Sequence, residues 1–145
     1  MTLITYSEEK QINPEELLNL YEDANWSAYT SSPEELESAV NNSLYVLTAR
    51  DGNKLVGLMR IVGDGITIVY IQDILVLRNY KRNKIGTTLI KKALEKFKKV
   101  RQKVLLTEDN PETRGFYESL GFESCDKGNL VSFVKLENKA NRIPE

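Results

Sequence analysis

The sequence predicts a single small α/β domain, and two features of its hydrophobic pattern indicate this class. Three apolar, strand-like runs follow one another between residues 44 and 77 with short turns between them. The spacing of apolar residues then changes to that of a helix over residues 85–100, and a further strand and helix follow. With 145 residues and 41% apolar side chains, the chain is long enough for one domain with its own core. We therefore expect residues 1–137 to form one domain and residues 138–145 a polar tail.

The first forty residues predict a short strand and two helices. The segment 2–6 has the composition of a strand. Asn13 is followed by a proline and two glutamates, which indicates a helix with an asparagine cap. Ser32 is followed by the same three residues and predicts a second helix with a serine cap. The aromatic segment 25–30 lies between the two helices as a linker.

The middle of the chain predicts the sheet. Residues 44–49, 55–62 and 66–77 have the composition of strands. The glycine-containing segments 51–53 and 63–65 turn the chain between them. Short turns between consecutive strands predict antiparallel pairing.

The last third predicts two more helices and two more strands. Apolar residues at helical spacing predict a helix over residues 85–100. Residues 104–107 are predicted as a short apolar strand. A helix capped by Asn110 follows, with Gly121 at its end in a left-handed conformation. Residues 129–136 are predicted as a final strand.

The composition excludes several catalytic mechanisms and kinds of metal site. There is no histidine, which excludes Ser-His-Asp and Cys-His catalysis and removes the most common zinc ligand. Cys125 is the only cysteine, so neither an internal disulfide nor a thiolate metal site can form. No apolar stretch is long enough to span a membrane and the first residues do not look like a secretory signal, so we expect a cytoplasmic protein without a metal ion. The reactive groups must then be carboxylates, tyrosines, backbone groups or a bound cofactor.

Basic residues gather in one segment of the chain. Eleven of the 20 Lys and Arg residues lie between Arg78 and Lys103, where Glu95 is the only acid, although the net charge of the chain is −1. Two interpretations are equally consistent with this pattern. The segment either binds an anionic ligand or forms a solvated helix face rich in lysine.

The segment 73–89 carries the clearest functional pattern. A buried strand leads into a basic loop, and the loop leads into the N-terminus of a helix. Free backbone N–H groups and the helix dipole favour an anion there, and Gly86 lets a ligand approach the backbone closely. The segment has neither the P-loop pattern nor the GxGxxG dinucleotide pattern. It therefore predicts a pyrophosphate-binding site of another kind.

Two motifs resemble those of the GNAT family of acetyl-CoA-dependent N-acetyltransferases. The family's pyrophosphate motif, Gln/Arg-x-x-Gly-x-Gly/Ala, falls on residues 81–86, with Lys81 and Lys84 at its first and fourth positions and a matching Gly86. Helical backbone angles at Lys84 would accommodate a side chain where the family has glycine. The second motif, Asn-x-x-Ala-x-x-x-Tyr-x-x-x-Gly-Phe, falls on residues 110–122 with threonine in place of the alanine. The order of the predicted elements agrees as well, so the resemblance spans nearly the whole chain.

The resemblance implies a fold and an activity. The fold is a mixed central sheet, an antiparallel meander followed by a splayed parallel strand pair, flanked by about four helices. The activity is transfer of an acetyl group from acetyl-CoA to an amine of a small molecule or peptide by direct attack. A backbone N–H of Leu75 or Val76 would stabilise the oxyanion. The residues implied to bind acetyl-CoA are Ile74, Leu75, Val76, Lys81, Arg82, Asn83, Lys84, Ile85, Gly86, Thr87, Asn110 and Tyr117.

Tyr117 and Asp73 are the candidate catalytic residues. A phenol can protonate the departing thiolate, and the place of Tyr117 in the second motif favours this role over that of a helix tyrosine that only packs. Asp73 interrupts an apolar strand face and is a candidate base with a raised pKa. Four alternatives stay open: a structural hydrogen bond, a bulge that turns Asp73 elsewhere, Glu108 as the base, or a chain of water molecules.

Trp26 and Tyr29 lie where the family often builds its acceptor pocket, and they are the candidate substrate-binding residues. The same side chains could instead anchor the linker to the core.

A non-catalytic CoA-binding or regulatory module is the alternative function. A nucleic-acid-binding domain is a third hypothesis, which the scarcity of aromatic residues among the basic ones disfavours. We expect neither a nucleic acid nor a membrane as partner, and the sequence leaves a homodimer open.

Overall fold

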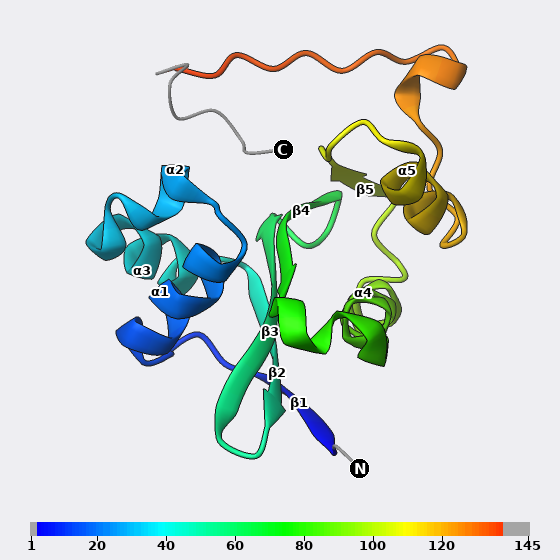
Figure 1. The fold of residues 1–145 in the computed structure, drawn as a ribbon. Coiled ribbons are helices and arrows are strands. Elements are labelled where there is room, and N and C mark those ends of the chain that lie inside the picture. Colours follow the sequence, from blue (N-terminus) through cyan, green and yellow to red (C-terminus); the bar gives the residue numbers. More distant parts are fainter. Residues whose placement is uncertain (1–2, 138–145) are drawn as a thin grey trace. The chain divides into compact units, whose positions relative to one another are not determined.

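The computed structural model describes residues 3–137, and the chain divides into two compact units (Figure 1). The described part of the first unit is residues 3–105, and that of the second unit is residues 106–137. The predicted polar tail, residues 138–145, lies outside the described residues.

The first unit is built on a five-stranded sheet with the strand order β1-β2-β3-β4-β5. The first three pairings are antiparallel, and β5 pairs with β4 in parallel. This confirms the predicted mixed sheet, in which an antiparallel meander is followed by a parallel pair. The strands are β1 (Ile4–Glu8), β2 (Tyr45–Asp51), β3 (Lys54–Gly63), β4 (Ile68–Val76) and β5 (Gln102–Leu105).

Helices cover both faces of this sheet. In Figure 1 the first three helices lie on one side of the central strands and α4 lies on the other. The helices of the first unit are α1 (Pro14–Asp23), α2 (Ser27–Thr30), α3 (Pro33–Asn41) and α4 (Ile85–Lys96), with a 3-10 helix η1 (Arg78–Asn83) before α4.

The starts of α1 and α3 differ. Asn13 Oδ1 accepts hydrogen bonds from Glu15 N (2.8 Å) and Glu16 N (3.3 Å), which confirms the predicted asparagine cap. The serine cap predicted for α3 is wrong, because the Ser32 side chain makes no capping hydrogen bond. Ser32 has a ψ of 77°, away from the extended geometry usual for a capping residue. Its backbone carbonyl accepts from Leu36 N (3.1 Å) and opens the helix instead.

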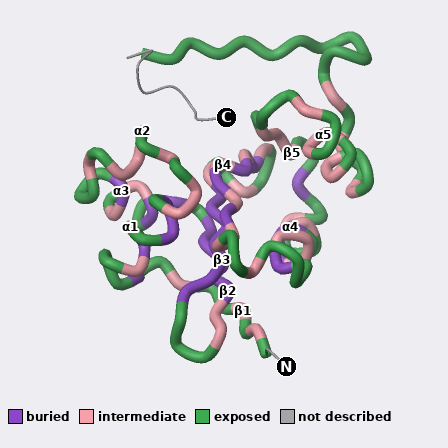
Figure 2. Tube along the Cα trace, in the orientation of Figure 1, coloured by how far each residue is buried: buried purple, intermediate pink, exposed green. Residues whose placement is uncertain are grey.

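The core lies between the sheet and the helices, and Figure 2 shows buried residues along β2, β3 and β4. α4 buries one apolar stripe against the sheet, as its spacing predicted, through Ile85, Leu89, Ile90 and Ala93. A second set of buried side chains packs around α1 and α3: Ile12, Leu17, Leu20, Tyr21, Leu36, Val40, Val46, Leu55, Leu58 and Leu75. Both faces of the sheet are therefore packed, and β4 is fixed between two apolar layers.

The second unit contains α5 (Pro111–Glu118) and a short 3-10 helix, η2 (Cys125–Lys127). Gly121 follows α5 with a φ of 95°, which confirms the predicted left-handed glycine. Phe122 N donates to Tyr117 O at 3.1 Å, so the chain folds back over the helix end.

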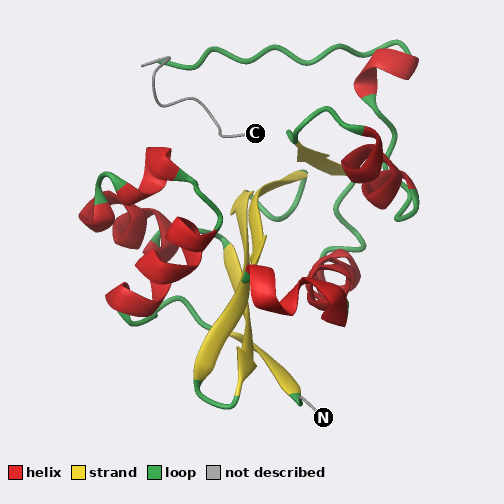
Figure 3. Cartoon of the chain, viewed as in Figure 1, coloured by secondary structure: helices red, strands yellow, loops and turns green. Residues whose placement is uncertain are grey.

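The final strand predicted over residues 129–136 is not formed. These residues have no strand pairing in the described chain, and Figure 3 draws them as loop. Their apolar side chains are exposed, with 70% of Leu130 and 93% of Phe133 open to solvent. The prediction used composition alone, but a strand also needs a neighbour to receive its backbone hydrogen bonds.

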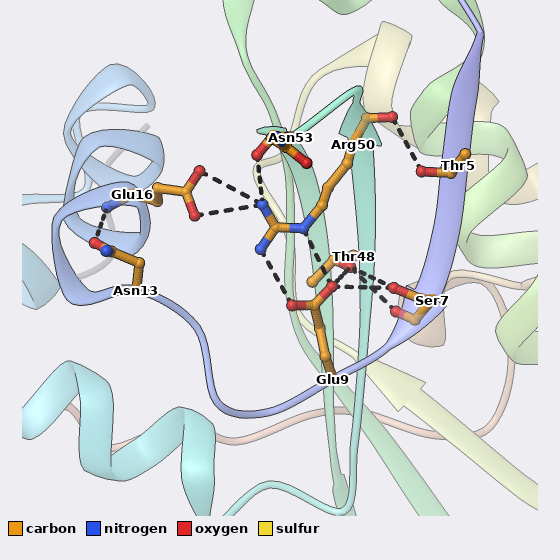
Figure 4. A network of polar contacts seen from close by, with 8 residues as sticks. All are labelled: Thr5, Ser7, Glu9, Asn13, Glu16, Thr48, Arg50 and Asn53. Carbon is orange, nitrogen blue, oxygen red and sulfur yellow. Dashed lines mark hydrogen bonds and ion pairs between the residues drawn. The ribbon is translucent and has the colours of Figure 1, made fainter.

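A polar network joins β1, β2 and α1 around Arg50 (Figure 4). The Arg50 guanidinium donates to Glu9 Oε1 (3.1 Å) and to Glu16 Oε1 (3.3 Å). Glu9 Oε2 also accepts from the hydroxyls of Ser7 (3.0 Å) and Thr48 (2.6 Å). The network therefore fastens the segment between β1 and α1 onto the sheet.

We expect this network to make stability depend on pH through Glu9. Burial opposes the charge of Glu9, but hydrogen bonds from Arg50, Thr48 and Ser7 outweigh burial and hold the pKa of Glu9 below its ordinary value. A depressed pKa contributes stability that is present above the unfolded value of about 4.3 and is lost as the pH falls. Urea denaturation should show that the free energy of unfolding falls more steeply between about pH 5 and pH 3 in the wild type than in Glu9→Gln. Parallel curves for the two proteins would contradict this.

Candidate functional site

One edge of β4 is open over the second half of the strand. β4 pairs with β5 only as far as Ile71, which lies opposite Leu105. From Gln72 onward no strand of the described chain pairs with this edge, although β3 continues to pair with the other edge. The backbone groups on the open edge are therefore available to a ligand. Three predicted cofactor-binding residues lie there: Ile74, Leu75 and Val76.

A β-bulge lies where β4 and β5 part. Arg60 of β3 lies opposite Asp73, and the next residue, Ile61, lies opposite Ile71, so Gln72 has no partner residue in β3. The extra residue shifts the alternation of side chains along β4. Beyond it Asp73 and Leu75 face α1, since Tyr21 donates a hydrogen bond to Asp73 and Leu75 packs in the apolar cluster around α1. The bulge is one of the alternatives that the sequence left open.

The Asp73 carboxylate is buried and accepts three hydrogen bonds. Its Oδ2 accepts from the Tyr21 hydroxyl (2.8 Å) and from Arg60 Nε (2.8 Å), and its Oδ1 accepts from the Tyr29 hydroxyl (3.0 Å). The Arg60–Asp73 ion pair has side-chain exposures of 7% and 0%. Arg60 Nη1 also approaches Ser43 Oγ at 3.4 Å. The structural hydrogen bond, another open alternative, is therefore present, while the role of Asp73 as a base stays a prediction.

Tyr29 connects the linker to this carboxylate. The segment predicted as a linker contains the four-residue helix α2, and Tyr29 lies on it. The Tyr29 hydroxyl donates to Asp73 and accepts from Gln72 Nε2 at 3.0 Å. Burial, followed by the charge of Asp73, raises the pKa of Tyr29, so the hydroxyl keeps its proton at neutral pH. Tyr29 therefore stays a donor towards Asp73.

Trp26 belongs to an aromatic cluster with two tyrosines. Its ring centroid lies 5.9 Å from that of Tyr21 and 5.7 Å from that of Tyr29. The indole is partly buried and packs against the apolar cluster beneath α1. These contacts are those of a side chain that anchors the linker to the core.

The basic loop forms η1 and is fixed by two acidic side chains. Arg78 N donates to Asp23 Oδ2 (2.8 Å) at the end of α1, and the Tyr80 hydroxyl donates to Asp51 Oδ2 (2.7 Å) at the end of β2. The hydrogen bond to Asp51 raises the pKa of Tyr80. The following side chains are exposed, and no ion pair among the described residues uses them: Lys81, Arg82, Asn83 and Lys84. The loop is thus held through its backbone and Tyr80, and its cations face solvent.

Lys84 has a left-handed backbone conformation, with φ of 57° and ψ of 25°. The helical angles that would accommodate a side chain at this position are therefore not present. The chain needs a left-handed residue to pass from η1 into α4, and glycine is the residue that adopts this conformation without strain. Lys84 is also the N-cap residue of α4, without a side-chain capping hydrogen bond, where a positive charge opposes the helix dipole.

Lys84→Gly is therefore expected to raise the free energy of unfolding by about 1 kcal/mol, as urea denaturation would measure. Relief of the left-handed strain and removal of a cation from the helix N-terminus outweigh the greater freedom of glycine in the unfolded chain. Lys84→Ala is the matched control, because it removes the charge but keeps the strain. Equal stability of the glycine and alanine variants would show that no strain is stored at this position.

Gly86 lies in the first turn of α4, beside the end of β4. A Cβ atom built on Gly86 would meet only Val76 Cγ2, at 3.9 Å, which is an ordinary contact. At Gly57, by contrast, a Cβ would come within 3.1 Å of Ile85 Cγ2, so the Ile85 side chain of α4 would have to shift to make room. Packing within the protein does not require a glycine at position 86. The contact with Val76 also shows that the open edge of β4 and the start of α4 are adjacent.

The remaining predicted site residues lie in the second unit. Asn110 Oδ1 accepts from Thr113 N at 2.8 Å and caps α5. Tyr117 is half-buried, with its ring centroid 5.0 Å from that of Phe116 and 5.7 Å from that of Phe122. Burial raises the pKa of Tyr117, and no described residue forms a hydrogen bond with its hydroxyl. The structure thus brings the loop, the open edge, Asp73 and Tyr29 together in the first unit, while Asn110 and Tyr117 belong to the second unit.

Three polar residues of the first unit lie at the site although they were not predicted from the sequence: Tyr21, Arg60 and Gln72. Arg60 had a detectable signal, since it is the one charge within the apolar run 55–62, just as Asp73 is in the next strand. Two opposite charges in neighbouring buried strands predict a pair. Gln72 had no such signal, because the bulge that aligns it with Asp73 is not visible in the residue pattern.

A mixed sheet that opens between two parallel strands, beside a cationic loop and a helix N-terminus, defines the class of α/β acetyltransferase folds. The profile of the Acetyltransferase (GNAT) domain matches residues 2–137, and the chain belongs to the GNAT family. This confirms the family and the fold class that the two motifs implied.

Solved structures of the family are similar to the chain. A GNAT-family acetyltransferase from Streptococcus pneumoniae TIGR4 is 37% identical with a TM-score of 0.83, and the match covers 94% of this chain and 99% of that one. An aminoglycoside acetyltransferase from an uncultured soil metagenomic sample, solved with sisomicin, is 20% identical with a TM-score of 0.68 and coverages of 92% and 97%. A transcriptional regulator from Bacillus halodurans C-125 is 17% identical with a TM-score of 0.72 and coverages of 93% and 99%. The last two show the fold alone, and no curated protein matches the chain.

Residues 3–137 lack two further features. No helix in this part of the chain is long and apolar enough to cross a membrane. The same residues contain no group of three or more acidic or cysteine side chains arranged to hold a metal ion.

Proposed function

We propose that the protein is an acetyl-CoA-dependent N-acetyltransferase and that residues 1–137 act as one catalytic domain. The observation that carries the proposal is the open edge of β4 beside the first turn of α4. Free backbone groups, a helix N-terminus and unpaired cations converge there, and each favours a different part of an acyl-CoA molecule. A thioester would supply an activated carbonyl at the open edge.

The first unit offers contacts for both ends of such a molecule. Backbone N–H groups of residues 83–87 and the cations of Lys81, Arg82 and Lys84 would bind the pyrophosphate. Backbone groups of residues 74–76 would bind the acyl end, and the N–H of Leu75 or Val76 would stabilise the oxyanion. The space beside Gly86 supports this arrangement, because packing does not use it.

Tyr117 is the proposed general acid. Its raised pKa keeps the hydroxyl protonated at neutral pH, and no described residue competes for that proton. Asn110 would shape this region by capping α5. Asp73, with a side-chain exposure of 0%, suits the positioning of its neighbours better than proton abstraction. Glu108 or a chain of water molecules would then serve as the base.

The proposed acceptor is an amine of a small molecule or peptide. Tyr29 is half-buried on α2 and is proposed to help bind it through the neighbouring Gln72 side chain, with Trp26 anchoring α2 beneath. The soil-metagenome structure bears an aminoglycoside, which makes this class of amine one member of the panel to test.

A non-catalytic CoA-binding or regulatory module is the second candidate, and one observation favours it. Lys84 stands in a left-handed conformation where the family's motif has glycine, and a side chain there reduces the space at the pyrophosphate end. Turnover of acetyl-CoA with a panel of amines separates the two functions, because only the enzyme releases CoA.

Acetyl-CoA is expected to stabilise the protein in a thermal melt. Ligand at about one hundred times its dissociation constant adds about 2.7 kcal/mol by mass action. Gly86→Ala should keep the melting temperature of the free protein, since a Cβ has room, but should weaken acetyl-CoA binding because the methyl group occupies ligand space. A melt that saturating acetyl-CoA does not shift would overturn the proposed function.

A further inference from the structure

Hydrogen bonds link Arg60 and Gln72 through Asp73 and Tyr29, and the donor of each bond is fixed. Arg60 pairs with Asp73, and a carboxylate can only accept hydrogen bonds. Tyr29 therefore donates its single hydroxyl proton to Asp73 Oδ1 at 3.0 Å. Because that proton is used, the Tyr29 oxygen acts as acceptor and receives Gln72 Nε2–H at 3.0 Å.

These hydrogen bonds determine the orientation of the Gln72 side-chain amide. The oxygen and nitrogen of a glutamine side chain have the same shape, and only their hydrogen-bond partners fix which atom lies where. Gln72 Nε2 is held by Tyr29, so Oε1 is the end that points away from Tyr29. No residue of the described chain donates a hydrogen bond to Gln72 Oε1.

Gln72 also lies at an irregular point of the sheet. It is the bulge residue of β4 and the first residue beyond the pairing with β5, which ends at Ile71. The backbone proposed to bind the acyl group begins two residues later, at Ile74. The carbonyl oxygen of a half-buried glutamine, to which no described residue donates, thus lies at the point where the open edge begins.

We propose that Gln72 Oε1 accepts a hydrogen bond from an N–H of the acceptor amine and so determines specificity, with Tyr29 and Asp73 as its positioning residues. This inference rests on the proposed function. A neutral carbonyl oxygen accepts from an ammonium and also from a free amine, so the contact is kept when the amine loses its proton. A primary or secondary amine fits, because it keeps an N–H for Gln72 while its lone pair attacks the acyl carbon.

Steady-state kinetics on the full chain test the assignment. The acceptor panel contains sisomicin, a linear polyamine and a tripeptide with a free α-amino group, and the amine that the wild type acetylates best serves as probe. Gln72→Met should raise the KM for that amine roughly 3- to 10-fold, the range expected for one neutral hydrogen bond. The dissociation constant for acetyl-CoA should not change, and neither should the melting temperature.

Tyr29→Phe tests the relay. It leaves Asp73 two donors, Tyr21 and Arg60, but frees the Gln72 amide to rotate, so the KM should rise by a similar factor. The double variant should be no worse than Gln72→Met, because Tyr29 acts through Gln72. The NMR signals of the Gln72 Nε2 protons should also shift in Tyr29→Phe. Tyr6→Phe is the matched control, since the Tyr6 ring contacts Lys92 and no described residue bonds its hydroxyl.

The outcomes separate the two proposals. Transfer by the wild type with an unchanged KM in Gln72→Met overturns this inference alone. Additive losses in the double variant overturn the relay, because each residue would then act independently. No acetyl transfer by the wild type to any amine overturns the proposed function and this inference together.

Discussion

Tyr117→Phe is expected to lower the rate of acetyl transfer by about 10²–10⁴-fold and to leave the affinity for acetyl-CoA nearly unchanged. The substitution removes only the hydroxyl that would protonate the departing thiolate. The ring keeps its edge-to-face contacts with Phe116 and Phe122, so α5 and the turn after it should stay intact. Turnover with the best amine of the panel, and the melting temperature, measure the two parts of this expectation.

Unchanged turnover in Tyr117→Phe would not by itself identify the acid, because slow product release can hide a slower chemical step. A pre-steady-state measurement of the acetyl-transfer step removes this ambiguity. If that step is also unaffected, Tyr117 is a packing residue and another group protonates the thiolate. Tyr6→Phe, which removes a hydroxyl that no described residue bonds, should change neither quantity.

Asp73→Ala is expected to cost about 3–5 kcal/mol of the free energy of unfolding. The reason is Arg60, whose side chain is only 7% exposed and would be left as an unpaired buried charge. The hydroxyls of Tyr21 and Tyr29 would lose their acceptor as well. Urea denaturation with Asp73→Ala and with the double variant Arg60→Met/Asp73→Leu tests this. The double variant should recover most of the loss, because both buried charges are gone.

The same pair of variants distinguishes positioning from base catalysis. If Asp73 abstracts a proton, the double variant stays inactive after its stability is restored. If Asp73 only positions its neighbours, the double variant keeps most of its rate at saturating amine and shows a raised KM. A loss below about 1 kcal/mol in Asp73→Ala would show that water reaches Arg60 and that the pair contributes little.

Local signals predicted most of the fold. The change of hydrophobic period at residue 85 located α4, and the Asn-Pro-Glu pattern located the starts of α1 and α5. The loop and the helix start were predicted because charge, glycine and position along the chain coincide over residues 81–86. Each of these signals lies within a few residues of the structure it predicts.

The features that the sequence did not predict depend on contacts between distant residues or on backbone geometry. Tyr21 and Asp73 are 52 residues apart, and nothing near either one indicates their hydrogen bond. The bulge at Gln72 arises from the register between β3 and β4. The left-handed angles of Lys84 follow from the path of the backbone between η1 and α4. A lysine in the sequence does not indicate such angles. Residues 129–136 have strand composition without a paired neighbour among the described residues.

The buried pair of Arg60 and Asp73 also limits how this sequence can change over time. A substitution that removes either charge first leaves the other one buried, at a cost comparable to much of the stability of an ordinary domain. An apolar pair would fit the same space, but the intermediate with one charge would seldom survive selection. Among descendants of this protein, the two positions should therefore change together or not at all, and their joint identity would trace lineages more faithfully than either residue alone.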